Sequence, residues 1–373
     1  MKVPFVSLNQ QIADNEKELF SVIRSTIKKG FFVGGEEVTS FEKQFAKFVG
    51  TKHCVSLNSG TDALIFGTRA LGLSTGDEMI FPAHTYYATL LAAVANGLKP
   101  VLSEVNSDDF GYDLSALKKK INSRTKAIMV VHLYGQADKI DEIQSIVKKT
   151  GRKIHIIEDS CQAHGAKLNS KRVGSFGTFS AFSFYPSKNL GAFGDGGAIT
   201  TNDAALEMRI RRVKEYGQSS KYHHESIGFN SRLDTLQAAL LSYKLHRLDG
   251  WNTKRQGNAV LYDKMLESIP EVTIPKTFAN RKSVHHLYVI RTKQRDKLHN
   301  FLKKEGVDTQ IHYPQPIHLQ NAWKSLNYKK GDFPVTEQLS DEIISLPMYP
   351  ELSRGQIRYV CNTIQKFFTK KKQ

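Results

Sequence analysis

The chain has 373 residues, of which 40% are hydrophobic and 24% charged, proportions typical of a globular protein with a large core and a smaller second lobe. No run of 18 apolar residues occurs and the N-terminus lacks an apolar signal core, so neither a transmembrane helix nor a secretory leader is expected. The three cysteines form no spaced pair, and this sparse use favours a reducing, cytoplasmic location.

The formal charge of +17 raises the question of a nucleic-acid partner. Lysine and arginine are spread along the whole chain, with short clusters at 117–120, 302–304 and 370–372, and no nucleic-acid motif accompanies them. We therefore expect a solvated basic surface that attracts an anionic diphosphate substrate, and neither a nucleic acid nor a membrane as partner. The last cluster is interpreted as a disordered tail.

Hydrophobic periodicity predicts strands and helices that alternate along the first two thirds of the chain. Such alternation is typical of an α/β fold with a mostly parallel, doubly wound sheet. Residues 217–230 are polar and are expected to form a loop. The expected strands lie at 54–57, 78–81, 100–105, 125–132, 154–157, 178–184 and 198–201, and the expected helices at 10–29, 37–49, 61–64 onward, 89–97, 115–121, 138–149, 204–216 and 233–248.

The last third predicts a small α+β lobe. Helical patterns at 252–267, 294–305 and 354–368 accompany a strand at 286–291. Asp249 and Gly250 end the preceding helix, so the boundary is placed there. The expected domains are a large domain at 1–249 and a small C-terminal domain at 250–373.

A single lysine, Lys188, lies between an aromatic strand and a glycine-rich run that ends at Gly197. Pro186 stops the strand, which places Lys188 just past a strand end, where α/β enzymes carry their chemistry. A lysine in a desolvated aromatic pocket has a lowered pKa and forms a Schiff base with a carbonyl compound. A surface lysine in a glycine-rich loop remains the alternative at this point.

A second candidate lies upstream, where Glu158 and Asp159 end a short buried strand. An acid at this strand end suits the protonated pyridine nitrogen of pyridoxal phosphate, which needs such a partner to act as an electron sink. Alternatively, Asp159 or Ser160 caps a helix. Cys161 is interpreted as a small buried residue rather than a nucleophile.

Two further stretches have both a functional and an ordinary interpretation. Asn58-Ser-Gly-Thr61 forms a turn before a helix, and such a helix N-terminus either binds a phosphate or is merely capped. His223 and His224 are adjacent, so they do not share a helix face, and no third ligand is spaced nearby. No metal site is therefore predicted.

Together these motifs resemble the DegT/DnrJ/EryC1/StrS family of sugar aminotransferases. The family pattern is matched by Glu158-Asp159, by Gln162, and by Ser183-Phe-Tyr-Pro-Ser-Lys188-Asn-Leu190. The likeness runs from about residue 4 to 368. It implies the aspartate-aminotransferase-like fold of type I, with a mostly parallel seven-stranded sheet flanked by helices and a small C-terminal α+β domain.

The resemblance implies pyridoxal 5′-phosphate as cofactor and Lys188 as the catalytic residue, since relatives that act as dehydratases carry histidine there. The expected cofactor contacts are Asp159 at the pyridine nitrogen, Gln162 at the phenolic oxygen, Ser183, Gly60 and Thr61 at the phosphate, and Tyr86 stacked on the ring, although Tyr86 alternatively fits a core position. Asn230, in Gly228-Phe-Asn-Ser-Arg232, would reach the cofactor phosphate of the neighbouring subunit in a homodimer with shared active sites.

The loop at 309–320, with His312 and Tyr313, resembles that of relatives acting at the 3-position of a nucleotide-linked ketosugar. His312, Tyr313 and Tyr185 would approach the sugar. The implied reaction moves the amino group of L-glutamate, leaving 2-oxoglutarate, to a dTDP-3-keto-6-deoxyhexose. A UDP-linked 3-ketosugar, a 4-ketosugar, and a non-catalytic regulator that binds the cofactor remain alternatives.

Overall fold

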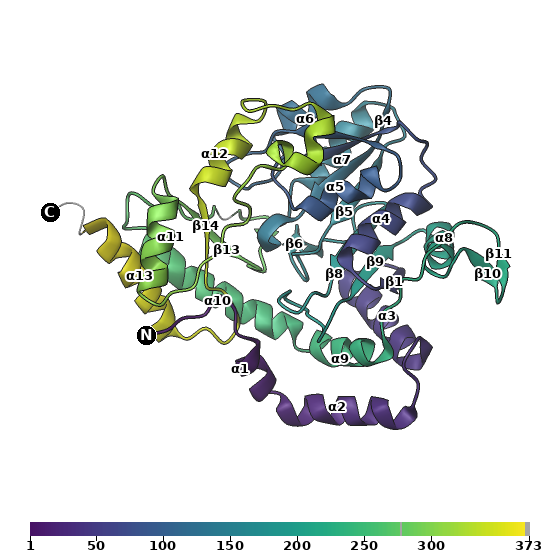
Figure 1. Cartoon of the computed structure of the whole chain (residues 1–373), viewed down its shortest axis with the longest axis horizontal. Coiled ribbons are helices and arrows are strands. Elements are labelled where there is room, and N and C mark those ends of the chain that lie inside the picture. The colour runs from purple at the N-terminus through teal and green to yellow at the C-terminus, as the bar shows by residue number, and fades with distance from the viewer. Residues whose placement is uncertain (277, 370–373) are drawn as a thin grey trace.

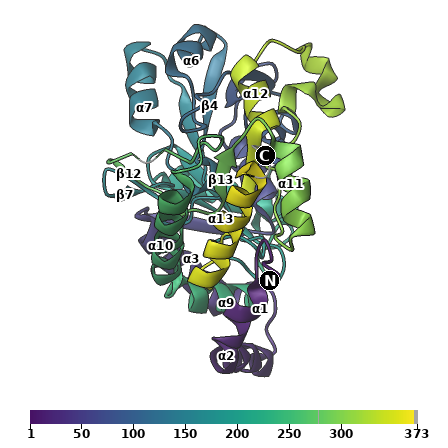
Figure 2. The same cartoon turned by 90° about the vertical axis from the view of Figure 1, so that its left-hand side faces the viewer.

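The computed structural model describes residues 1–276 and 278–369. The cluster at 370–372, interpreted above as a disordered tail, lies outside the described residues. A central sheet with helices on both faces forms the larger part of the molecule, and the C-terminal helices pack beside it (Figures 1 and 2).

The central sheet confirms the predicted mostly parallel α/β fold. In the described part of the chain it has seven strands in the order β1-β9-β8-β5-β4-β2-β3. β9 runs antiparallel to both of its neighbours, and the pairs from β8 to β3 are parallel. The strands are β1 (His53–Leu57), β2 (Glu78–Pro82), β3 (Lys99–Ser103), β4 (Thr125–Val131), β5 (His155–Asp159), β8 (Phe179–Ser183) and β9 (Gly197–Thr201).

Helices cover both faces because side chains on a strand alternate between them. On β5, Ile157 packs in a core with α4, α5 and α8, whereas Ile156 packs in another core with α6 and α7. α3 and α9 cover the β8–β9–β1 end. These helices are α3 (Gly35–Val49), α4 (Gly60–Ala70), α5 (Tyr87–Val94), α6 (Leu114–Lys120), α7 (Ile140–Lys149), α8 (Ala204–Lys214) and α9 (Thr235–Leu245).

The predicted helix at 10–29 is two helices, α1 (Leu8–Ala13) and α2 (Glu16–Lys29). Asn15 separates them, because its side chain hydrogen-bonds Gln11 O and accepts from Tyr243 and Arg247 instead of continuing the helix. Gly30 ends α2 in a left-handed conformation, as its position predicts.

The C-terminal part forms its own hydrophobic core, which Val3 of the N-terminus joins. β13 (Tyr288–Arg291) pairs antiparallel with β14 (Ile343–Leu346), and α10 (Leu248–Leu266), α11 (Arg295–Lys304), α12 (Pro334–Glu342) and α13 (Arg354–Thr369) complete the part. α12 and β14 were not expected from the sequence. The prediction that Asp249 and Gly250 end a helix is wrong, because the preceding helix α9 ends at Leu245 and α10 runs through both residues. The domain boundary at 249/250 stays a prediction.

The segment 217–230, expected to be a loop, contains a short hairpin of β10 (Gln218–Ser220) and β11 (His223–His224). The hairpin projects from the edge of the molecule beyond α8 (Figure 1). Other short elements lie in connections and were not predicted: β6 (Lys167–Leu168), β7 (Lys171–Arg172), β12 (Arg281–Lys282), and the 3₁₀ turns η1 (Leu133–Gly135), η2 (Ile317–Leu319) and η3 (Asn321–Leu326).

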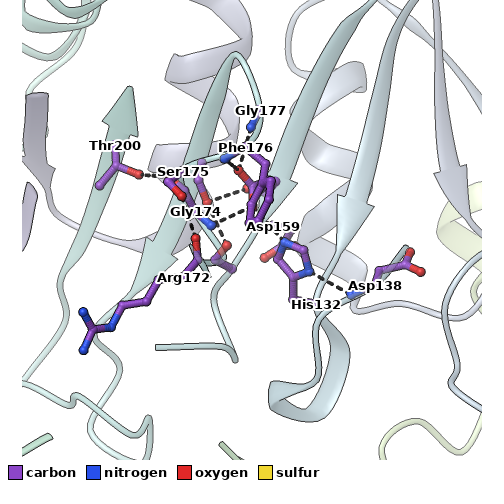
Figure 3. Close-up of polar contacts among 12 residues, drawn as sticks. His132, Asp138, Asp159, Arg172, Gly174, Ser175, Phe176, Gly177 and Thr200 are labelled. Carbon is purple, nitrogen blue, oxygen red and sulfur yellow. Dashed lines mark hydrogen bonds and ion pairs between the residues drawn. The ribbon is translucent and has the colours of Figure 1, made fainter. Parts of the chain in front are cut away.

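The carboxylate of Glu158 is fully buried near the end of β5. It accepts hydrogen bonds from the backbone nitrogens of Gly174, Phe176 and Gly177 at 2.6, 2.8 and 2.7 Å. His132 Nε2 donates the fourth at 3.0 Å, because its Nδ1 already accepts from the Asp138 nitrogen. Figure 3 shows the loop at 174–177, which carries these backbone donors, beside the end of the strand.

Replacing Glu158 with glutamine tests this network. The glutamine side chain would turn amide hydrogens toward backbone N–H groups, which cannot accept them, and the negative charge of Glu158 would be lost. We therefore expect the free energy of unfolding to fall by about 2–4 kcal/mol. Urea denaturation measures it, with the exposed Glu16→Gln as the matched control, expected to change stability by less than about 0.5 kcal/mol. Equal midpoints for the two variants would contradict a supporting role for the Glu158 carboxylate.

Candidate active site

A cavity of about 440 Å³ lies at the carboxyl ends of the parallel strands. In a parallel sheet these ends meet at one edge, where loops can gather functional side chains. Of the predicted site residues, all of them within the described chain, ten line this cavity and Asn230 does not. The ten are Gly60, Thr61, Tyr86, Asp159, Gln162, Ser183, Tyr185, Lys188, His312 and Tyr313.

Lys188 is half-buried in a tight turn after β8. Its backbone nitrogen donates to Tyr185 O at 2.8 Å, and a Cβ at Gly191 would lie 2.2 Å from Pro186 O, so this turn needs glycine. Burial lowers the pKa of the Lys188 amine, while Cys161 and Asp159 oppose the shift. A lowered pKa increases the share of neutral amine, the form that attacks a carbonyl carbon.

Helix α9 holds the glycine-rich loop that follows the lysine. Gln237 accepts from the Phe193 nitrogen at 2.8 Å and donates to the Phe193 oxygen at 3.2 Å. Buried Lys244 donates to Gly191 O at 2.7 Å and lies 4.4 Å from the centre of the Phe193 ring. The loop that carries Lys188 is therefore fixed by side chains of a core helix.

Asp159 lies on the same face of β5 as Ile157, the face that α5 covers. Its side chain is buried and accepts a hydrogen bond from Thr89 of α5 at 2.9 Å and one from the Cys161 nitrogen at 3.2 Å. Thr85 contacts Thr89 at 2.9 Å. The two bonds fix the orientation of a carboxylate that faces the cavity and suits a cationic ring nitrogen.

The N-terminus of α4 forms another wall of the cavity. Ser59 caps the helix by accepting from the Asp62 nitrogen at 3.1 Å. A Cβ at Gly60 would lie 2.6 Å from Ser183 Cβ and 3.0 Å from Cys161 Sγ, so the backbone approaches β8 as only glycine allows. Free backbone N–H groups and the helix dipole favour an anion here.

Aromatic side chains line the mouth of the cavity. Tyr86 is 54% exposed, so the alternative of a core tyrosine is wrong, and its ring lies 5.4 Å from that of Tyr313. Gln162 accepts from the Tyr134 nitrogen at 2.7 Å and donates to the Tyr313 hydroxyl at 3.1 Å. Tyr185 is 55% exposed beside the lysine loop.

His312 joins the cavity from the C-terminal part of the chain. Its Nδ1 contacts Ser345 Oγ at 2.9 Å, and its carbonyl oxygen accepts from the Tyr134 hydroxyl. Burial, with a smaller effect of the Lys188 charge, lowers the pKa of His312 to about 4, so its ring is neutral near pH 7. A neutral imidazole can both donate and accept hydrogen bonds.

Sequence reasoning missed His286, which lines the same cavity. It also missed His164, a fully buried ring that packs against Phe182 and Phe184, 5.4 and 5.8 Å between ring centres. The tandem histidines 285–286, at the start of the predicted strand 286–291, were the available signal for His286. Its approach to the lysine depends on long-range packing, which periodicity does not report.

Asn230 is exposed and lies after the hairpin, where it pairs with Glu215 in an isolated bridge. It stays outside the cavity of its own chain. Its predicted contact with a neighbouring subunit stays a prediction. Within the described residues, no cluster of histidine, cysteine, aspartate or glutamate has the arrangement of a metal site, and no helix is long and apolar enough to cross a membrane.

Comparison with known proteins places the chain in a class. Residues 13–365 match the DegT/DnrJ/EryC1/StrS aminotransferase family, and the chain belongs to that family. It is 42% identical over 365 residues to the dTDP-3-amino-3,6-dideoxy-alpha-D-galactopyranose transaminase of Aneurinibacillus thermoaerophilus, covering 98% of this chain and 99% of that one. It is 39% identical over 359 residues to the UDP-2-acetamido-2-deoxy-3-oxo-D-glucuronate aminotransferase of Pseudomonas aeruginosa, covering 96% and 98%.

Solved structures agree with this placement. The chain is similar to DesV of S. venezuelae in complex with a ketimine intermediate, with a TM-score of 0.95, 40% identity and 98% of each chain covered. It is also similar to ntda of Bacillus subtilis with bound cofactor pmp, with a TM-score of 0.90 and 28% identity over 98% of this chain and 85% of that one. The predicted family, type I fold and class of pyridoxal-phosphate-dependent aminotransferase are thereby confirmed.

Proposed function

We propose that this chain transfers the amino group of L-glutamate to the keto group of a dTDP-linked 3-keto-6-deoxyhexose, in the biosynthesis of an amino-deoxysugar for a surface polysaccharide or a glycosylated metabolite. One observation carries the proposal. A single cavity combines a lysine of lowered pKa, an oriented buried carboxylate and a glycine-lined helix N-terminus.

These residues fit pyridoxal phosphate. The N-terminus of α4, with Gly60 and Thr61, suits the phosphate, and Ser183 faces Gly60 across a gap that a Cβ would fill. Asp159 would hold the ring nitrogen in its protonated form, Gln162 would contact the phenolic oxygen, and Tyr86 would stack on the ring. When bound, the cofactor supplies an aldehyde that takes up the amino group and a ring that delocalises the electrons of the broken C–H bond.

Lys188 performs the proton transfers. With the cofactor and glutamate bound, the free Lys188 amine would take the proton from the α-carbon of the amino acid and pass it to the cofactor's aldehyde carbon. Burial lowers the pKa of this amine, which keeps a larger share of it neutral and able to act as the base. The same two steps in reverse place the amine on the ketosugar, giving ping-pong kinetics.

The sugar assignment rests on the cavity mouth and on the relatives. Tyr185, His312 and Tyr313 line the cavity that holds Lys188, so they are available to a sugar bound there. The A. thermoaerophilus relative is a dTDP-3-amino sugar transaminase and supports the 3-keto dTDP substrate. The P. aeruginosa relative is a UDP-linked 3-oxo sugar aminotransferase, so a UDP-linked acceptor is the second candidate, and the positive net charge suits either diphosphate.

We further propose that the enzyme is a cytoplasmic homodimer with shared active sites. Asn230 follows the hairpin that projects from the molecule in Figure 1. Near it, Ile227 and Phe229 are 81% and 39% exposed, an apolar surface that suits a second copy of the chain. The Asn230 amide of one chain would then donate to the cofactor phosphate held by its partner.

Replacing Lys188 with alanine tests the catalytic assignment. We expect the visible absorbance of the cofactor–lysine linkage to disappear and turnover to fall by at least about 10⁴-fold, because both nucleophile and base are lost. Absorbance spectra and an amine-transfer assay measure these effects, and circular dichroism checks that the fold is kept. An active variant would overturn the role of Lys188.

A subunit-mixing experiment tests the shared sites. Lys188→Ala and Asn230→Asp would each be inactive alone, the latter because a carboxylate repels the phosphate. If Asn230 acts on the partner's cofactor, unfolding and refolding the two together restores up to about a quarter of wild-type activity, from one intact site in each mixed dimer. No recovery, with mixed dimers demonstrated by mass spectrometry, would contradict the arrangement.

A further inference from the structure

His286 lies at the reaction centre without a role in the mechanism above. It precedes β13, is 8% exposed, and lines the cavity that holds Lys188 and His312. Tyr185 and Tyr313, which are expected to approach the sugar, line the same cavity.

The orientation of the neighbouring Asn189 side chain is fixed by its buried partners. Asn189 Nδ2 donates to Val284 O at 3.0 Å and to Asn252 Oδ1 at 2.8 Å. The amide of Asn252 is itself oriented, because its Nδ2 donates to His164 O at 2.8 Å. The remaining atom of Asn189, the oxygen Oδ1, therefore faces His286 Nδ1 at 3.2 Å.

This geometry fixes the tautomer of His286. An amide oxygen only accepts, so Nδ1 carries the hydrogen of the imidazole. Burial keeps the ring neutral, because it lowers the pKa of His286 well below its usual value, and Lys188, Arg255, His312 and His164 act in the same direction. Nε2 is then left with a lone pair, and the one hydrogen bond of this ring within residues 1–276 and 278–369 is the Nδ1 contact with Asn189.

We propose that His286 Nε2 accepts a hydrogen bond from a hydroxyl group of the sugar while the keto group reacts above Lys188. A lone pair of fixed position matches a hydroxyl group that donates a hydrogen bond. Because Asn189 keeps the imidazole hydrogen on Nδ1, Nε2 cannot present a hydrogen to the substrate. The amino donor carries no hydroxyl group, so His286 serves the sugar half of the reaction. The inference rests on the proposed function and adds a substrate-binding residue to it.

By contrast, the tautomer of His312 is not fixed in this way. Its Nδ1 contacts the Ser345 hydroxyl, which can donate or accept. His312 can thus present either a hydrogen or a lone pair at Nε2, whereas His286 presents only the lone pair. The two rings can bind different groups of one substrate.

The test compares His286→Phe with His286→Gln, which keeps an acceptor oxygen near the position of Nε2, in separately measured half-reactions. For His286→Phe we expect the reaction with L-glutamate, followed by absorbance, to stay within about threefold of wild type, and the reaction of the aminated enzyme with the ketosugar to slow by about 10- to 100-fold. His286→Gln recovers part of the second rate.

His164→Phe is the matched control. It also replaces a buried neutral imidazole near Lys188, but this ring lies outside the cavity lining and neither nitrogen has a hydrogen-bond partner in the described chain. We expect both of its half-reactions to stay near wild type. Equal slowing of both half-reactions in His286→Phe, or no slowing of either, would overturn the role of His286. Failure of wild type with glutamate would instead reject the proposed function.

A second readout does not depend on turnover. In protein labelled with ¹⁵N-histidine and free of cofactor, we expect His286 to show a protonated Nδ1 and an unprotonated Nε2 between pH 6 and 8. Asn189→Leu removes the acceptor and should release this preference. A protonated Nε2 in the wild type would overturn the proposal whatever the rates show.

Discussion

The burial of Glu158 is the constraint on which the active site depends. A carboxylate in the core is costly unless its oxygens are hydrogen-bonded, and here three backbone nitrogens and His132 satisfy it. The bonds attach the loop at 174–177 to the end of β5 (Figure 3). Because side chains alternate along a strand, fixing Glu158 on one face fixes Asp159 on the other, where it meets Thr89 and the cavity.

The lysine is positioned from three directions. α9 holds the glycine loop through Gln237 and Lys244, the turn at Gly191 sets the approach of the chain, and Asn189 connects the loop to α10 and to the segment at 284–286. The last connection links residues that are far apart in sequence. It orients His286 at a cavity built mainly by the sheet, while contacts with Ser345 and Tyr134 hold His312 there. The site thus depends on the packing of the C-terminal part against the sheet.

The sequence predicted what depends on local pattern. Periodicity identified all seven sheet strands, and the resemblance to the family pattern identified Asp159, Gln162, Ser183 and Lys188, which line one cavity. The sequence-based prediction failed where long-range contacts determine the structure. The break at Asn15 depends on Tyr243 and Arg247, the strand at 343–346 needs β13 as its partner, and the ring of His286 is oriented by Asn189. None of these contacts leaves a periodic signal.

The most direct test of the central claim is transfer of the amino group itself. Purified enzyme with pyridoxal phosphate, ¹⁵N-labelled L-glutamate and a dTDP-linked 3-keto-6-deoxyhexose would be analysed by mass spectrometry of the nucleotide sugar. The account predicts a product in which a ¹⁵N amine replaces the ketone, formed together with 2-oxoglutarate and absent with Lys188→Ala. Formation of 2-oxoglutarate without labelled dTDP-sugar, but with labelled UDP-sugar when a UDP-linked 3-ketosugar is supplied, would contradict the nucleotide assignment. No labelled sugar from any ketosugar would contradict the account as a whole.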